Sequence, residues 1–120
     1  MKRGDLVIVS LPGDYKKPRP AVVLQNDRLE GKLDSYVIAL LTTSNEGARI
    51  LRVEVEPTAG NGLRETSRVM ADKLYAIPAH RMHQHIGKLD AAAMRRIERA
   101  LMIILDLDPV RPVVIDEQTI

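Results

Sequence analysis

One stretch near the N-terminus joins a stiff basic segment to an apolar one, Lys16-Lys17-Pro18-Arg19-Pro20-Ala21-Val22-Val23-Leu24. The two prolines fix φ on either side of Arg19, and Pro20 also moves Arg19 out of the helical region. The guanidinium is therefore presented from a stiffened backbone at the entry to an apolar, β-branched strand. Because a guanidinium grips phosphate with two donors at once, the stretch predicts a phosphate-binding arginine. The alternative is a surface arginine on a turn before an edge strand.

Short apolar runs separated by turn residues predict strands on both sides of this stretch. The segment 35–41 is nearly all apolar, which indicates a central strand covered on both faces. In 51–55 apolar and charged residues alternate, which is typical of a half-exposed strand. The other predicted strands are 6–9, 21–25 and one or two within 67–77, and the predicted loops or turns are 11–20, 26–34, 57–62 and 78–87.

A single helix is predicted near the C-terminus. Asp90 has the side chain of an N-cap for a helix from Ala91 to about Leu105. Four apolar residues recur at helical spacing on one face, namely Met94, Ile97, Leu101 and Ile104. The last turns, Ala100–Leu105, are apolar on all sides, so we expect cover there from the sheet or from a second subunit.

Composition limits the class of protein without assigning a function. A chain of 120 residues, 45% hydrophobic and 28% charged, is typical of one globular domain. There is no cysteine, no run of about 18 apolar residues and no signal-peptide pattern, so a cytoplasmic location is expected. The net charge of +2 and the three tyrosines, without Phe or Trp, neither require nor exclude nucleic-acid binding.

Many short strands followed by one helix predict a mainly β protein, in which a small, strongly bent antiparallel sheet closes on itself and carries a C-terminal helix. We expect one domain over residues 1–108. The segment 109–120, which follows two aspartates and contains two prolines, is expected to be a tail outside the core.

Several blocks, in this order, resemble the PemK/MazF family of toxin endoribonucleases from about Lys2 to Leu107. They are Gly4-Asp5, Arg19-Pro20-Ala21-Val22-Val23, the run from Val37 to Ser44, and Val69-Met70-Ala71-Asp72. The resemblance implies an SH3-like (PemK/CcdB-type) small β-barrel with a terminal helix, working as a homodimer. It also implies the toxin of a type II toxin–antitoxin system, held in check by a cognate antitoxin protein. The implied activity is a sequence-selective, metal-independent endoribonuclease, without a cofactor, that cleaves single-stranded RNA or mRNA to 2′,3′-cyclic phosphate ends.

Three residues are candidates for the chemistry. Arg19 stays protonated and suits stabilisation of the charge that develops on phosphate. On its own, Thr42-Thr43-Ser44 at the end of a predicted strand favours a polar turn that hydrogen-bonds its own backbone. The resemblance matches Thr42 to the family's catalytic threonine or serine. Asp14 stands where many relatives have a glutamate, and it is a candidate general base, a holder of Arg19, or a turn residue.

Further residues are candidates for binding RNA. Lys16 and Lys17, together with Arg81 in the predicted loop 78–87, would surround a phosphate track. Asp72 matches an acidic family position that implies base contacts or a dimer face. Some relatives have an arginine where this chain has Met70, so any contact of that arginine must be absent or come from elsewhere.

The remaining aromatic and histidine residues give weaker indications. Tyr15 or Tyr36 is expected to assist in binding unpaired bases. His80, His83 and His85 have no neighbouring carboxylate or cysteine in the sequence, so a solvated loop is expected in place of a catalytic metal site.

Two alternatives to a nuclease stay open. One is a toxin of the same fold that binds DNA gyrase and resembles CcdB, and the other is a catalytically weak binding module. Arg19 and Thr42 favour the nuclease, because a gyrase-binding protein has no need of them.

Overall fold

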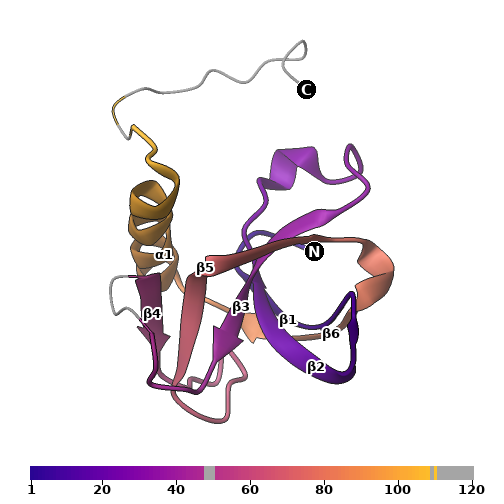
Figure 1. Ribbon diagram of the computed structural model, residues 1–120, viewed down its shortest axis with the longest axis horizontal. Coiled ribbons are helices and arrows are strands. Elements are labelled where there is room, and N and C mark those ends of the chain that lie inside the picture. Colours follow the sequence, from indigo (N-terminus) through magenta and orange to yellow (C-terminus); the bar gives the residue numbers. More distant parts are fainter. Residues whose placement is uncertain (48–50, 109, 111–120) are drawn as a thin grey trace.

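The computed structural model describes residues 1–47, 51–108 and 110, without the side chains of residues 14–16. Figure 1 shows the arrangement of a curled sheet with one helix beside it. In chain order the elements are β1 (Asp5–Leu11), β2 (Asp14–Val23), the 3-10 turn η1 (Asp27–Leu29), β3 (Tyr36–Thr42), β4 (Arg52–Val55), β5 (Ser67–Ile77), the 3-10 turn η3 (Ala79–Arg81), β6 (Met82–Lys88) and α1 (Ala91–Leu105). None of the described helices is long and apolar enough to cross a membrane.

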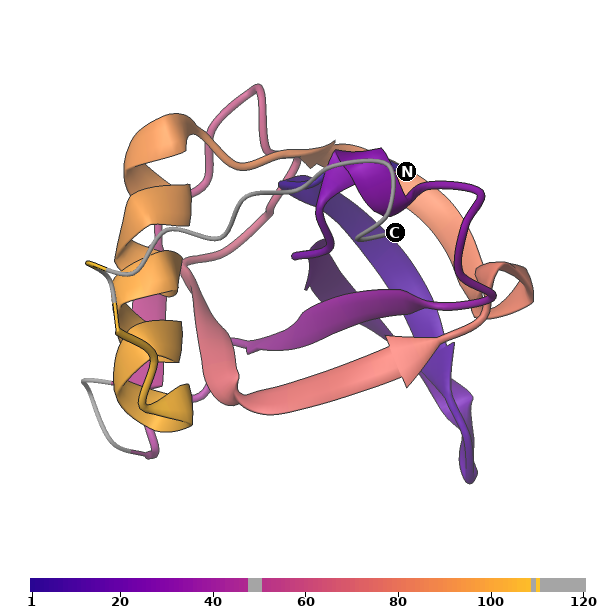
Figure 2. The ribbon, with the colours of Figure 1, turned by 90° about the horizontal axis from the view of Figure 1, so that it is seen from above.

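All six strands form one antiparallel sheet in the order β4-β5-β3-β2-β1-β6. The sheet curls round between its two outer strands, β4 and β6, as the view from above in Figure 2 shows. The turn after β4 bridges them, because the Lys88 N–H donates to the Gly60 carbonyl at 2.9 Å. A Cβ at Gly87 would lie 2.3 Å from the Asn61 backbone, so only glycine permits this approach. The predicted fold class, mainly β with a C-terminal helix, is confirmed, but the sheet does not close into a barrel, because its edge strands β4 and β6 share no ladder among the described residues.

Apolar residues alternate between the two faces of the curled sheet, as period-two strands require. The helix-side cluster lies under α1 and consists of Leu6, Val22, Leu24, Ala39, Leu41, Val53, Val55, Val69, Ala71, Leu89, Ala93, Ile97 and Ala100. The opposite cluster consists of Val7, Val9, Leu11, Ala21, Val23, Ile38, Leu40, Met70 and Ile77. The predicted central strand is confirmed, since Ile38–Leu41 of β3 are buried and the strand has neighbours on both sides.

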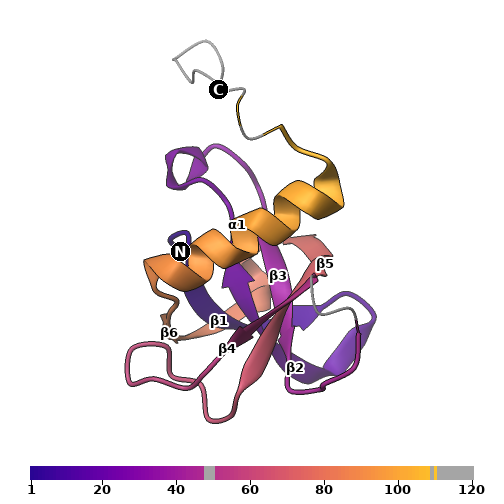
Figure 3. The same ribbon diagram turned by 90° about the vertical axis from the view of Figure 1, so that its left-hand side faces the viewer.

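The predicted helix is confirmed with its cap. The Asp90 carboxylate accepts from the Ala93 N–H at 2.8 Å, and Ile97 is fully buried on the face that meets the sheet. Figure 3 shows α1 lying across the sheet, where it contacts β4 and β5. Its C-terminal end is less covered, because Ile103 and Leu105 remain 56% and 50% exposed. The apolar end of the helix is therefore only partly buried by its own sheet.

Two loop predictions were wrong. Residues 14–20 belong to β2, although Pro18 and Pro20 have no N–H. The prolines are tolerated because β2 pairs with β3 only from Ala21 onward, so the proline-containing half has a neighbour strand on one side alone. The segment predicted as irregular at 78–87 forms η3 and most of β6, an edge strand held by pairing with β1. Tertiary pairing here overrides weak local strand propensity.

Candidate nucleic-acid interface

Arg19 and Thr42 lie on the same face of the sheet. On β2, Arg19 alternates in phase with Ala21 and Val23, and on β3 Thr42 alternates in phase with Leu40. Those three apolar residues all belong to the opposite cluster, so both polar side chains continue its face beyond the apolar core. Antiparallel pairing of β2 with β3 brings the two strand segments together.

A hollow of about 530 Å³, called here the Arg19 hollow, opens at this place. Its lining residues come from the end of β1, the β1–β2 turn, and β2, β3 and β5, and they are Leu11, Pro12, Gly13, Arg19, Leu40, Thr42, Met70, Lys73 and Tyr75. Its floor is apolar and its polar groups are two cations and two hydroxyls. Such a hollow suits an anionic ligand that also carries flat apolar surface.

Thr42 is held by the backbone of its own turn. The Ser44 N–H donates to the Thr42 hydroxyl at 3.1 Å, so the polar turn predicted for this segment is present. A hydroxyl that accepts one hydrogen bond still has its own proton to donate. The turn therefore fixes the oxygen while leaving a donor for a ligand in the hollow.

The other candidate residues whose side chains the structure describes do not line the Arg19 hollow. Lys17 is exposed, two residues before the half-buried Arg19 on the same strand. Arg81 lies in η3, which contacts β1, but it does not line the Arg19 hollow. The side chains of Asp14 and Lys16 lie outside the described part of the structure.

Asp72 is engaged within the protein. Its carboxylate accepts from Arg52 at 3.1 and 3.4 Å. Along the same edge, Arg68 pairs with Glu54 at 2.7 Å and donates to the Ser44 carbonyl at 3.3 Å. These contacts tie the start of the β3–β4 connection to β4 and β5, so Asp72 serves to position Arg52.

His83 and His85 contact different side chains. His83 Nε2 lies 2.8 Å from the Ser10 hydroxyl, and His85 Nε2 lies 3.4 Å from the Asp5 carboxylate. Within the described residues no group of three His, Asp or Glu side chains is arranged to hold a metal ion.

The lining residues that β5 contributes, Met70, Lys73 and Tyr75, were not among the predicted site residues. Sequence reasoning favoured Tyr15 or Tyr36 as the assisting aromatic residue. Tyr36 instead packs against the opposite cluster, and the Tyr15 side chain is outside the described part of the structure. No local pattern in the sequence places Tyr75 beside Arg19, because the placement depends on how β5 pairs with β3.

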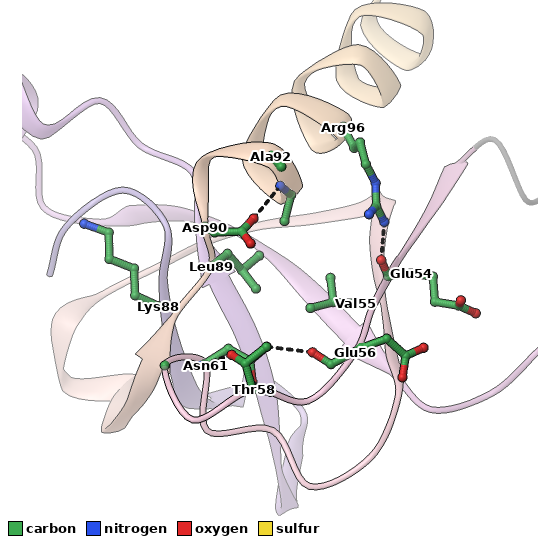
Figure 4. A pocket seen from close by; sticks show the side chains of 12 residues that line it. Glu54, Val55, Glu56, Thr58, Asn61, Lys88, Leu89, Asp90, Ala92 and Arg96 are labelled. Atoms are coloured by element: carbon green, nitrogen blue, oxygen red, sulfur yellow. Dashed lines mark hydrogen bonds between the residues drawn. The ribbon is translucent and has the colours of Figure 1, made fainter.

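A second hollow, of about 600 Å³, lies under the start of α1 (Figure 4). It has mixed charge, with Glu56 and Lys88 at its rim, and the Arg96 guanidinium donates to the Glu54 carbonyl of the edge strand. The buried Asn61 amide has partners for both its oxygen and its nitrogen. The polar groups here serve to close the turn and cap the edge strand β4.

Comparisons with known proteins point to one family. Residues 2–105 match the family described as PemK-like, MazF-like toxin of type II toxin-antitoxin system. The probable endoribonuclease MazF of Mycolicibacterium smegmatis is 35% identical over 108 residues, covering 89% of this chain and 98% of that protein. Endoribonuclease MazF9 of Mycobacterium tuberculosis is 29% identical over 115 residues, covering 89% and 98%.

Solved structures show the same fold. The Mycobacterium tuberculosis toxin MazF-mt6 superposes with a TM-score of 0.74 at 29% identity, covering 87% of this chain and 98% of that one. A mycobacterial endoribonuclease in complex with its cognate antitoxin superposes with a TM-score of 0.77 at 22% identity, covering 90% and 97%.

Proposed function

Because the chain belongs to the family of PemK-like, MazF-like toxins of type II toxin–antitoxin systems, we propose that it is a toxin that cleaves single-stranded RNA. The proposed activity is that of a sequence-selective endoribonuclease that works without a metal ion or another cofactor. The observation that carries this proposal is the placement of Arg19 and Thr42 in one hollow. Both come from strands of a packed sheet, which holds catalytic groups more firmly than a loop does.

The proposed chemistry uses the RNA as its own nucleophile. The 2′-hydroxyl loses its proton and attacks the adjacent phosphorus, the 5′-oxygen leaves with a proton, and a 2′,3′-cyclic phosphate and a 5′-hydroxyl remain. Negative charge grows on the non-bridging oxygens, where the Arg19 fork supplies two donors and Thr42 supplies one. Asp14 is the proposed general base, acting on the 2′-hydroxyl or holding Arg19 in place.

The proposed RNA path runs from the Arg19 hollow over the proline-containing half of β2. Lys16 and Lys17 lie on that half, and Arg81 lies across β1 from it. Phosphate contacts of this kind set the position of the strand without selecting bases. Asp72 contributes through Arg52, whose guanidinium it orients.

We also propose a homodimer controlled by an antitoxin in the cytoplasm. The exposed apolar end of α1 supports a subunit contact, because Ile103, Leu105 and Leu107 are each at least half exposed. The side chains that donate to phosphate oxygens donate to carboxylate oxygens as well, so an acidic, partly apolar antitoxin segment suits the same groove. Such a segment would order on binding and be easily removed by proteolysis.

The test of the nuclease is direct. Purified protein is incubated with mixed RNA in excess EDTA, and the cut ends are mapped. We expect cleavage with 2′,3′-cyclic phosphate ends, and resistance when the sugar at the cut site is 2′-O-methylated or deoxy. Cleavage that stops in EDTA and returns with zinc or magnesium contradicts the mechanism. Inhibition of gyrase without RNA cleavage would favour the CcdB-like alternative, and neither activity would favour a binding module.

The shared groove has its own test. Replacing Lys16, Lys17 and Arg19 together should weaken binding of RNA and of the antitoxin in parallel, and both should weaken as salt rises. A triple variant that loses RNA but keeps full affinity for the antitoxin shows that inhibition uses another surface.

A further inference from the structure

β5 contains an irregularity that changes which of its side chains face the Arg19 hollow. Between the pairs Leu41↔Val69 and Ala39↔Leu74, β3 advances by two residues while β5 advances by five. The three extra residues are an odd number, so the side-chain alternation of β5 changes phase across the bulge. Leu74 accordingly packs with the helix-side cluster, and Tyr75 takes the other face, opposite Ile38.

The consequence is that a cation and an aromatic ring enter the hollow together. Lys73 and Tyr75 both line it, beside Arg19 and Thr42. Without the bulge, the phase set by Met70 would have continued to Asp72 and Leu74, which would put a carboxylate and an aliphatic side chain there instead.

Both side chains are available to a ligand. Tyr75 is 38% exposed, whereas Tyr36 is packed against the opposite cluster. Lys73 is exposed and forms no ion pair within the described residues, in contrast to Arg52 and Arg68 on the same edge, whose guanidinium groups already hold carboxylates.

We propose that Lys73 and Tyr75 form a nucleotide subsite next to the scissile phosphate, in which Tyr75 stacks on an unpaired base and Lys73 binds a neighbouring phosphate. This inference rests on the proposed function and adds specificity-determining residues to it. Stacking on tyrosine is the ordinary way to hold an unpaired base, and a lysine beside it binds the backbone as a point charge. Lys73 thereby supplies a positive charge next to Met70, where some relatives carry an arginine.

The binding test uses a short single-stranded RNA from a mapped cut site, with a 2′-O-methyl group at the cleaved nucleotide so that it stays intact. Fluorescence anisotropy over a series of salt concentrations gives Kd and its salt slope. Tyr75→Ala should raise Kd about 5- to 150-fold, and Tyr75→Phe should leave it within about twofold. Lys73→Gln should make the negative slope of log K against log salt less steep by about 0.7, because one phosphate contact is lost. Lys88→Gln, which removes a lysine at the second hollow, is the matched control and should keep the slope.

A second arm separates stacking from a structural effect. Each nucleotide of the same RNA is replaced in turn by an abasic one, and Tyr75→Ala is compared with the wild type on every version. The penalty of Tyr75→Ala should disappear at one position, because the base that stacks there is already gone. An equal penalty on all versions, no penalty at all, or a Lys73→Gln slope equal to that of Lys88→Gln overturns the inference. If the wild type binds no single-stranded RNA, the proposed function itself fails; if it binds and both variants bind equally well, only the subsite fails.

Discussion

Arg19 of β2 and Thr42 of β3 occupy corresponding positions on one face of the sheet and line the same hollow of about 530 Å³. Each side chain lies two residues along its strand from a buried apolar residue on the same face, which is Ala21 for Arg19 and Leu40 for Thr42. The packed core therefore sets where the two polar groups stand. Such rigid placement of donors is what stabilisation of a charged transition state requires.

Arg19→Ala should reduce RNA cleavage by on the order of 10²–10³-fold, because one preorganised donor group to the developing charge is lost. Single-turnover cleavage of a mapped RNA measures the loss, and denaturant unfolding should show a change within about 1 kcal/mol, since Arg19 is only half-buried. Arg19→Lys keeps the charge without the fork of donors, so its cleavage rate should lie between those of the wild type and Arg19→Ala. Wild-type rates in Arg19→Ala would remove the residue from the mechanism.

Thr42→Val should slow cleavage by on the order of 10²-fold, because it removes the hydroxyl while keeping the branched shape of the side chain. Thr42→Ser keeps the hydroxyl and is the matched control. If both variants cut RNA equally fast, the hydroxyl serves only its hydrogen bond to the Ser44 N–H, and not the chemistry.

Ile103→Lys combined with Leu105→Lys should convert a dimer into a monomer. Both residues are exposed and apolar near the end of α1, where lysine suits the helix dipole and should not harm the helix. Sedimentation at micromolar concentration should give about twice 13.4 kDa for the wild type and 13.4 kDa for the variant. Arg99→Ala, an exposed change on the same helix, should leave the mass unchanged; a monomeric wild type contradicts the proposed assembly.

Asp90→Ala should lower the free energy of unfolding by about 1 kcal/mol, because the Ala93 N–H loses its acceptor at the start of α1. Asp90→Asn keeps a capping oxygen and should recover most of the loss. Urea unfolding measures both. Since the cap lies away from the Arg19 hollow, the cleavage rate of the folded variant should stay at the wild-type level.

The N-terminus should contribute stability that depends on pH. The hydrogen bond from Lys2 at 2.8 Å lowers the pKa of Glu30 below its usual range, and the same bond raises the pKa of Lys2. The Glu30 contribution is therefore present above the unfolded-state pKa of glutamate, about 4.3, and is lost as the pH falls through the lower folded-state value. The Lys2 contribution is present below about 10.4 and is lost as the pH rises through its raised value.

This pH dependence is checked with Glu30→Gln. The difference in unfolding free energy between wild type and variant should be visible at pH 7 and should close as the pH approaches 3. It should also shrink in high salt, because the pair is exposed. A difference that stays constant from pH 7 to pH 3 would show that the carboxylate charge has no part in it.

The sequence by itself determined the class of the fold and the ends of its best-marked elements. The cap at Asp90 and the apolar period that follows it are local, so the helix was predicted over its full length. The buried strand β3 was equally evident from an unbroken apolar run. Arg19 and Thr42 were identified because a stiffened arginine and a strand-end hydroxyl are visible as residues, with the family resemblance assigning the role of Thr42.

Only the tertiary structure decided that residues 14–20 and 82–88 are strands, because their backbone hydrogen bonds depend on β1, which borders both. It also decided the partners of the site. The Asp72 carboxylate forms an ion pair with Arg52, and the bulge in β5 places Lys73 and Tyr75 in the same hollow as Arg19. An extra residue in one strand is defined only against the strand it pairs with, so no reading of β5 alone can give the phase of its side chains.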